Sequence, residues 1–194
     1  RDEQIEYVKV GIDTAKKLSA DKVRVFGGHP VEGKTKKEWI EIIIECLYPC
    51  VEYAKENNIV LAIENHGDLP GRSEEILYIL NKVNSPYLKC NIDIGNFVAD
   101  NMEKKENPII ATKNLIKNVV HSHVKDFKYF PDSPELEGCI LGEGIVPISD
   151  CLKVFKENGY NGYFSLEFEG QKYYDEKEGI IKSIENLRRI IKNL

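Results

Sequence analysis

The chain has 194 residues, of which 42% are hydrophobic and 30% are charged, and its formal net charge is −5. This is the composition of an ordinary globular protein, and it predicts a single domain over residues 1–194. The acidic charge argues against a nucleic-acid partner, and no apolar run reaches the roughly 20 residues that a membrane span needs. The five cysteines include no CxxC pair, which favours buried thiols in a reducing cytoplasm over disulfides or a structural zinc site.

Hydrophobic periodicity predicts a regular alternation of helices and strands along the chain. The expected helices have apolar residues at helical spacing and lie at 5–18, 35–54, 73–83, 108–117, 147–157 and 180–191. The expected strands lie at 22–26, 59–64, 88–93, 119–125 and 163–167, with a sixth, very short strand that ends at 141–144. Because strict alternation of strand and helix is typical of a parallel sheet covered by helices, we expect an α/β protein.

Three local motifs refine this interpretation. Thr35 and Glu38 fit a capping box, in which each side chain accepts a hydrogen bond from the other residue's backbone N–H, so a helix is expected to begin there. Residues 126–140 contain prolines and lack a helical period, and they predict a long loop. A flat, doubly wound sheet is the competing architecture, but the segment 27–30 (GGHP) does not match the glycine-rich phosphate loop typical of such sheets.

Four of the expected strands end in a side chain that can bind a metal ion: Glu64, Asp93, His123 and Glu167. One such acid alone is more often a helix cap or an ion-pair partner. Four of them at the ends of apolar strands would be costly to bury unless they were paired or ligated. Because the carboxyl ends of successive barrel strands converge on one mouth, we expect these residues to share one ion. Three carboxylates and one imidazole suit Mn²⁺ or Mg²⁺, and they accommodate Co²⁺ or Zn²⁺ less selectively.

The segments that carry these residues (IENHG, NIDIGN, HSHVKD and SLEFEG), together with LGEG, occur in an order and spacing that resemble a known family. This family is the xylose-isomerase-like TIM barrels of the sugar-phosphate isomerases and epimerases. The resemblance implies that Glu64, Asp93, His123 and Glu167 bind one divalent ion, with Mn²⁺ as the first expectation. A full member would carry about two more strand–helix units before Arg1, so the resemblance also implies an incomplete barrel of about six parallel strands.

The resemblance implies a chemistry as well. In this family a proton is transferred next to a substrate carbonyl, through an enediolate that the metal stabilises. By resemblance, Glu64 and Glu167 would remove and return the proton, as in a ketose 3-epimerase or an aldose–ketose isomerase acting on a sugar or sugar phosphate. A metal-dependent lyase of the dehydroshikimate-dehydratase type and a non-catalytic truncated barrel are the alternatives. An open barrel edge would favour a homo-oligomer.

Four further residues are candidates for substrate binding: His29, His66, Asn96 and Lys125. Lys125 shares the strand face of His123, where it would neutralise the enediolate or pair with a neighbouring acid. The family often has a histidine where Asn96 stands. This departure, together with the acidic net charge, argues against the three-zinc endonucleases of the same fold.

The residues that follow the expected strands also have structural interpretations. Asp126 is expected either to orient Lys125 or to cap the following loop. Glu143 lies between two glycines, which indicates a tight turn. His121 is expected to pack or to hydrogen-bond within the wall of the barrel, and Glu169 to be exposed or to contact the ligands from outside.

Overall fold

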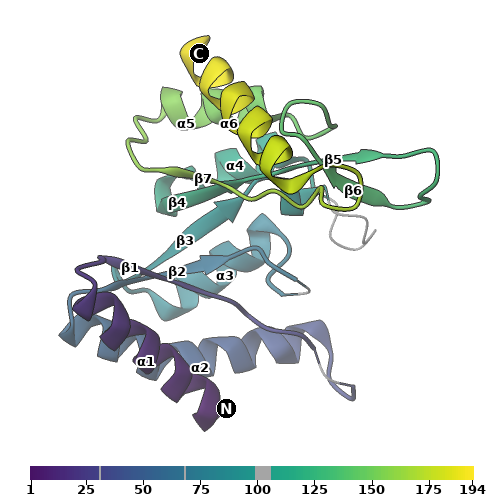
Figure 1. Cartoon of the computed structure of the whole chain (residues 1–194). Helices are drawn as coiled ribbons and strands as arrows, with labels where there is room; N and C mark the ends of the chain where they lie inside the picture. The colour runs from purple at the N-terminus through teal and green to yellow at the C-terminus, as the bar shows by residue number, and fades with distance from the viewer. Residues whose placement is uncertain (31, 68, 99–105) are drawn as a thin grey trace. The chain divides into compact units, whose positions relative to one another are not determined.

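The structure is a computed structural model that describes residues 1–30, 32–67, 69–98 and 106–194 (Figure 1). Helices and strands alternate along these residues, as the sequence predicts. The helices are α1 (Asp2–Lys17), α2 (Lys36–Glu56), α3 (Ser73–Val83), α4 (Pro108–Leu115), α5 (Ile148–Glu157) and α6 (Glu176–Lys192), with short 3-10 turns η1 (Gly95–Phe97) and η2 (Ile116–Asn118). The strands are β1 (Lys22–Val25), β2 (Val60–Glu64), β3 (Leu88–Asp93), β4 (Val119–Val124), β5 (Asp126–Tyr129), β6 (Leu136–Cys139) and β7 (Phe164–Leu166).

The described residues form two compact units. The first contains Arg1–Asn91 and Asn118–Val120, and the second contains Ile92–Lys117 and His121–Leu194. That the whole chain folds as one domain stays a prediction. Among the described residues, no helix combines the length and the apolar character that crossing a membrane requires.

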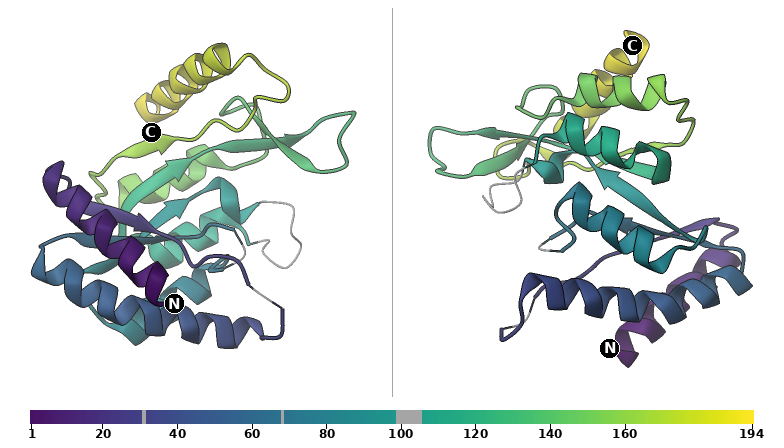
Figure 2. Two further views of the ribbon diagram at one scale, coloured as in Figure 1. Left: turned by 60° about the horizontal axis from the view of Figure 1, so that its bottom comes forward. Right: turned by 180° about the vertical axis from the view of Figure 1, so that it is seen from behind.

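In the first unit, β1, β2 and the start of β3 form a parallel sheet. Glu64, the last residue of β2, lies opposite Asn91 of β3. The helices α1 and α2 lie side by side (Figure 2). The predicted capping box is confirmed, because Thr35 Oγ1 accepts from Glu38 N at 3.3 Å and Glu38 Oε2 accepts from Thr35 N at 2.7 Å. The last residue of β1, Val25, and the residues Leu61, Ala62 and Ile63 of β2 are buried.

In the second unit, β4 and β7 pair in parallel, with His123 opposite Ser165. The end of β3 lies beside β4, because Ser122 Oγ donates to Ile92 O at 2.9 Å and Ile94 N donates to His123 O at 3.2 Å. The strand order is therefore β1-β2-β3-β4-β7, and these five strands are parallel. Asp93 and His123 are thus brought to the same end of adjacent strands by the backbone pairing.

Two expectations for the residues after β4 are wrong. β5 and β6 pair antiparallel in a separate two-stranded sheet, where the sequence predicts a loop (Figure 1). Residues 141–144 form a turn, with Gly142 at φ +89°, so the described residues contain five parallel strands and not six. The prolines that suggested a loop, Pro131 and Pro134, lie in the connection between β5 and β6 and interrupt neither strand.

Candidate functional site

Three of the four predicted metal ligands gather in the second unit. Asp93 ends β3, His123 lies on β4, and Glu167 directly follows β7. Their ligand atoms all lie within 4.8 Å of one another, and His123 Nδ1 is 2.9 Å from Glu167 Oε1. Oxygen and nitrogen atoms that bind one ion at about 2 Å lie roughly 3–4 Å apart, so this group could hold a divalent ion if its side chains moved slightly closer together.

The turn that follows β3 orients the carboxylate of Asp93. Asp93 Oδ1 accepts from Gly95 N at 2.9 Å and from Asn96 N at 3.1 Å. The side chain of Asp93 is fully buried, so these two bonds fix its direction. Asn96 therefore contributes to the cluster through its backbone. A contact between its side chain and a substrate stays a prediction.

Lys125 supplies the positive charge of this cluster. Its Nζ lies 3.1 Å from Asp93 Oδ2, 3.1 Å from Glu167 Oε2 and 2.7 Å from Glu169 Oε1, and only 2% of the residue is exposed. Burial alone would lower the pKa of Lys125, but the neighbouring carboxylates, Asp93 first, outweigh it and hold that pKa above its ordinary range. These contacts agree with the prediction that Lys125 shares the strand face of His123. Of the two roles expected for Lys125, the structure contains the pairing with neighbouring acids.

The two oxygens of Glu167 have different partners. Oε1 faces His123 Nδ1, and Oε2 faces Lys125 Nζ. The hydrogen bond from His123 and the charge of Lys125 hold the pKa of Glu167 well below its usual range, against the opposing effect of burial. Glu167 is therefore a carboxylate at neutral pH, which is the state needed in a metal ligand or a general base.

Asp126 caps a loop, as one of the two interpretations expected, but this loop follows β6 and is not the segment directly after Asp126. Its carboxylate accepts four backbone hydrogen bonds, from Phe127 at 2.9 Å, Gly142 at 2.8 Å, Gly144 at 2.9 Å and Val146 at 3.0 Å. Burial raises the pKa of Asp126 although these four bonds oppose the increase. The loop after β6 is thereby anchored to the residue next to Lys125.

Gly144 is expected to tolerate no side chain in this loop. A Cβ there would lie 2.2 Å from Asp126 Oδ1 and 2.4 Å from Phe127 O. We expect Gly144→Ala to lower the free energy of unfolding by about 1–3 kcal/mol, measured by urea denaturation. The control is Gly11→Ala in α1, where the added Cβ would meet only Val23 Cγ1 at 3.6 Å. Equal stability of the two variants would contradict the close packing of Gly144 against Asp126.

The fourth predicted ligand, Glu64, lies in the first unit with a cluster of its own. It ends β2 and is fully buried. Arg24 Nη1 lies 3.4 Å from Glu64 Oε2, and His66 Nδ1 lies 3.7 Å from the same oxygen. The ring of Phe26 bridges these two groups, at 4.5 Å from Arg24 Cζ and 4.6 Å from the His66 ring centroid. The sequence analysis did not identify Arg24 of β1 or Phe26, which directly follows β1, although their spacing of two residues in an extended segment could have indicated a shared face.

The remaining residues considered in the sequence analysis are histidines. His29 is exposed and lies against Gly67, where an added Cβ would be 3.3 Å from His29 Cε1. His121 Nε2 lies 2.8 Å from Ser165 Oγ, so the prediction that His121 hydrogen-bonds within the wall is confirmed. Substrate binding by His29 and His66 stays a prediction.

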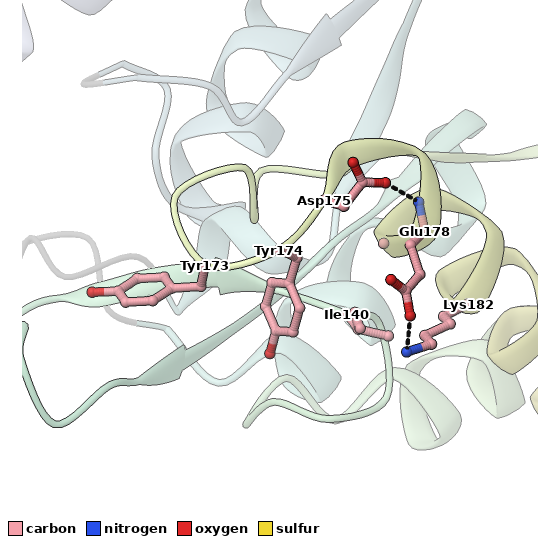
Figure 3. A pocket seen from close by; sticks show the side chains of 7 residues that line it. Ile140, Tyr173, Tyr174, Asp175, Glu178 and Lys182 are labelled. Carbon is pink, nitrogen blue, oxygen red and sulfur yellow. Dashed lines mark hydrogen bonds and ion pairs between the residues drawn. The ribbon is translucent and has the colours of Figure 1, made fainter.

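A separate hollow of about 190 Å³ lies in the second unit (Figure 3). Lys182 Nζ pairs with Glu178 Oε1 at 2.5 Å, and the carboxylate of Asp175 caps α6 by accepting from the backbone N of Glu178 at 2.9 Å. None of the predicted site residues lines it; the residues that do are Ile140, Tyr173, Tyr174, Asp175, Glu178, Gly179 and Lys182. This hollow is therefore distinct from the cluster around Lys125.

Comparison with known families decides the fold. The family model described as the xylose isomerase-like TIM barrel matches residues 1–190. The chain belongs to this family. The fold class that the sequence motifs imply is thereby confirmed, with five parallel strands in the described residues.

Two curated relatives are similar to this xylose isomerase-like chain over most of its length. MJ1311, an uncharacterized protein of Methanocaldococcus jannaschii, is 25% identical over 169 residues, which cover 84% of this chain and 56% of that protein. UlaE of Shigella boydii, an L-ribulose-5-phosphate 3-epimerase, is 25% identical over 187 residues, which cover 94% of this chain and 62% of the epimerase. The chain therefore spans less than two thirds of the length of either relative.

Two solved structures share the fold. The IOLI protein, crystallised with a zinc atom, has a TM-score of 0.81 at 22% identity, over 100% of this chain and 72% of that protein. A xylose isomerase-like TIM barrel protein from Mycobacterium smegmatis, in complex with magnesium, has a TM-score of 0.75 at 19% identity, over 98% of this chain and 66% of that protein. At these identities the likeness shows the fold alone.

Proposed function

We propose that this chain forms the site of a divalent-metal-dependent isomerase or epimerase of a sugar or sugar phosphate, with ketose 3-epimerisation as its first candidate reaction. The observation that carries the proposal is the cluster of the buried Asp93 and His123 with the half-buried Glu167, beside the ammonium of Lys125. The name of the relative UlaE, an L-ribulose-5-phosphate 3-epimerase, supports the same class of reaction. A small-molecule sugar is then the partner, and a cytoplasmic location and a homo-oligomer are parts of the proposal.

The proposed metal ligands are Asp93, His123, Glu167 and Glu64. Glu64 is included because β2 and β3 are neighbouring parallel strands whose carboxyl ends open on the same side of a sheet, and Glu64 and Asp93 are their last residues. The donor set of carboxylates and one imidazole suits Mn²⁺, with Mg²⁺, Co²⁺ and Zn²⁺ as alternatives. A bound ion would act as a Lewis acid on the substrate carbonyl and the neighbouring hydroxyl.

The residues of the chain would divide the remaining work. Glu167, held as a carboxylate by His123 and Lys125, would take the proton from the carbon next to the carbonyl. Glu64, carrying a proton taken up from solvent before the step, would deliver that proton to the opposite face, which inverts the carbon and gives the 3-epimer. Exchange of protons with solvent would then reset Glu167 and Glu64. Lys125 would offset the negative charge that develops on the substrate oxygens. An aldose–ketose isomerase needs only one of the two carboxylates as a base.

The alternative enzyme is a lyase of the dehydroshikimate-dehydratase type. It would use the same cluster to dehydrate a cyclic hydroxy acid. The alternative without catalysis is a truncated barrel that binds sugar or assembles without turnover. Screening of ketoses, ketose phosphates and cyclic hydroxy acids separates the three.

Metal binding is the first test of the proposal. We expect Mn²⁺ at 100 times its dissociation constant to stabilise the chelator-treated protein by about 2.7 kcal/mol and to raise Tm by about 5–10 °C. Calorimetry measures the affinity, and NMR in D₂O follows the exchange of the substrate C3 proton. Asp93→Asn should abolish the Tm increase, whereas Asp150→Asn, on the exposed side of α5, should retain it. A protein that neither binds Mn²⁺ nor exchanges the proton would contradict the proposal.

A further inference from the structure

The charges at the strand ends differ between the two units. In the second unit, the cation Lys125 is buried, and the exposed charges of the cluster are the carboxylates of Glu167 and Glu169, whose side chains are 27% and 47% exposed. In the first unit, the carboxylate of Glu64 is buried, and the exposed charge is the guanidinium of Arg24, whose side chain is 40% exposed. An anionic group of a substrate is therefore attracted to the strand ends of the first unit.

Arg24 is held in one orientation. Arg24 Nη1 lies 3.4 Å from Glu64 Oε2, and Arg24 Cζ lies over the ring of Phe26, 4.5 Å from the ring centroid. The ring of Phe26 also contacts the ring of His66, with the two centroids 4.6 Å apart. A guanidinium oriented in this way loses little side-chain entropy on binding, and its planar fork matches the oxygens of a phosphate.

We propose that Arg24, supported by Phe26, binds the phosphate of the substrate and so makes the site specific for phosphorylated sugars. This inference rests on the proposed function, because it assigns the substrate class of the same site. Arg24 is a specificity-determining residue and takes no part in proton transfer. Its contact with Glu64 places the phosphate-binding group next to one of the two carboxylates proposed to move protons.

The test compares binding of phosphorylated and unphosphorylated sugar. The full chain loaded with Mn²⁺ is titrated by calorimetry with both enantiomers of ribulose 5-phosphate and of ribulose, in the presence and absence of inorganic phosphate. We expect the wild-type protein to prefer the phosphorylated sugar about 10- to 100-fold, which is the range for charge-assisted hydrogen bonds. Inorganic phosphate should compete with ribulose 5-phosphate.

Three variants make the comparison specific. Arg24→Met should reduce the preference to nearly one, and the ratio of the two affinities cancels any effect that acts through Glu64. Arg24→Lys should retain part of the preference, because lysine keeps the charge and loses the planar fork. Arg72→Met is the matched control in the same unit. The Nε of Arg72 lies 3.2 Å from Glu74, and this variant should keep the full preference.

Equal affinity of the wild-type protein for the two sugars would overturn the inference, as would a preference that survives in Arg24→Met or is lost in Arg72→Met. Proton exchange in D₂O separates this result from the proposed function. Phosphate preference without exchange supports the role of Arg24 and contradicts the isomerase. Exchange on both sugars without preference supports the isomerase and overturns the role of Arg24.

Discussion

Glu167→Gln is expected to lower kcat by about 10²–10⁴-fold through the loss of proton transfer alone. Glutamine has the size and shape of glutamate, but its amide cannot accept the proton and carries no charge toward the metal. The neutral amide also ends the attraction to Lys125 Nζ, which lies 3.1 Å from Glu167 Oε2 in the wild-type protein. Because the amide carries no negative charge, the variant should also bind Mn²⁺ more weakly.

Proton exchange at C3 of the substrate, followed by NMR, measures the effect on the chemical step. Glu169→Gln is the matched control, because Glu169 also contacts Lys125, at 2.7 Å, but lies outside the proposed ligand set. This control should cost less than tenfold in kcat. A loss in Glu169→Gln as large as that in Glu167→Gln would show that the contact with Lys125, and not proton transfer, explains the result.

Lys125→Met is expected to lower the free energy of unfolding of the metal-free protein by about 3–5 kcal/mol. Methionine keeps much of the side-chain volume and removes the ammonium. The carboxylates of Asp93, Glu167 and Glu169 then remain close together without the cation that lies within 3.1 Å of each of them. Urea denaturation in the presence of a chelator measures the change.

A divalent ion should rescue this variant. Because the three carboxylates lack their internal cation in Lys125→Met, Mn²⁺ should stabilise the variant more than it stabilises the wild-type protein. The control is Lys128→Met, since Lys128 lies near the surface, 3.4 Å from Glu143, and should contribute less than about 1 kcal/mol. Stability of Lys125→Met within 1 kcal/mol of the control would contradict the central position of Lys125.

The elements that could be predicted from the sequence are those with a long hydrophobic period. α2 begins at Lys36 with the predicted capping box, and β2 and β3 end at the predicted residues, Glu64 and Asp93. β5 and β6, of four residues each, could not be predicted, because their pairing joins Asp126 to Cys139 across the chain. The prolines of their connection indicate a loop, and these two strands lack the alternation with helices that identified the equally short β1 and β7.

The same distinction applies to the site. The sequence by itself determined which side chains end the strands, because the backbone of a parallel strand carries its last residues to one end of the sheet. The strand-end pattern therefore indicated Asp93, His123 and Glu167 as candidate ligands. Their gathering within 4.8 Å was an inference from strand spacing, and the structure of the second unit agrees with it.

Only the tertiary structure decided the partners of the charged groups around the ligands. Lys125 meets Glu169 from 44 residues away, and Asp126 binds the amides of Gly142 and Gly144 from 16 and 18 residues away. Arg24 meets Glu64 across two strands of the first unit. Side-chain direction, burial and strand pairing together select these partners, and a linear pattern specifies none of the three at such separations. The ligands are a property of strand ends, whereas their electrostatic environment is a property of the folded chain.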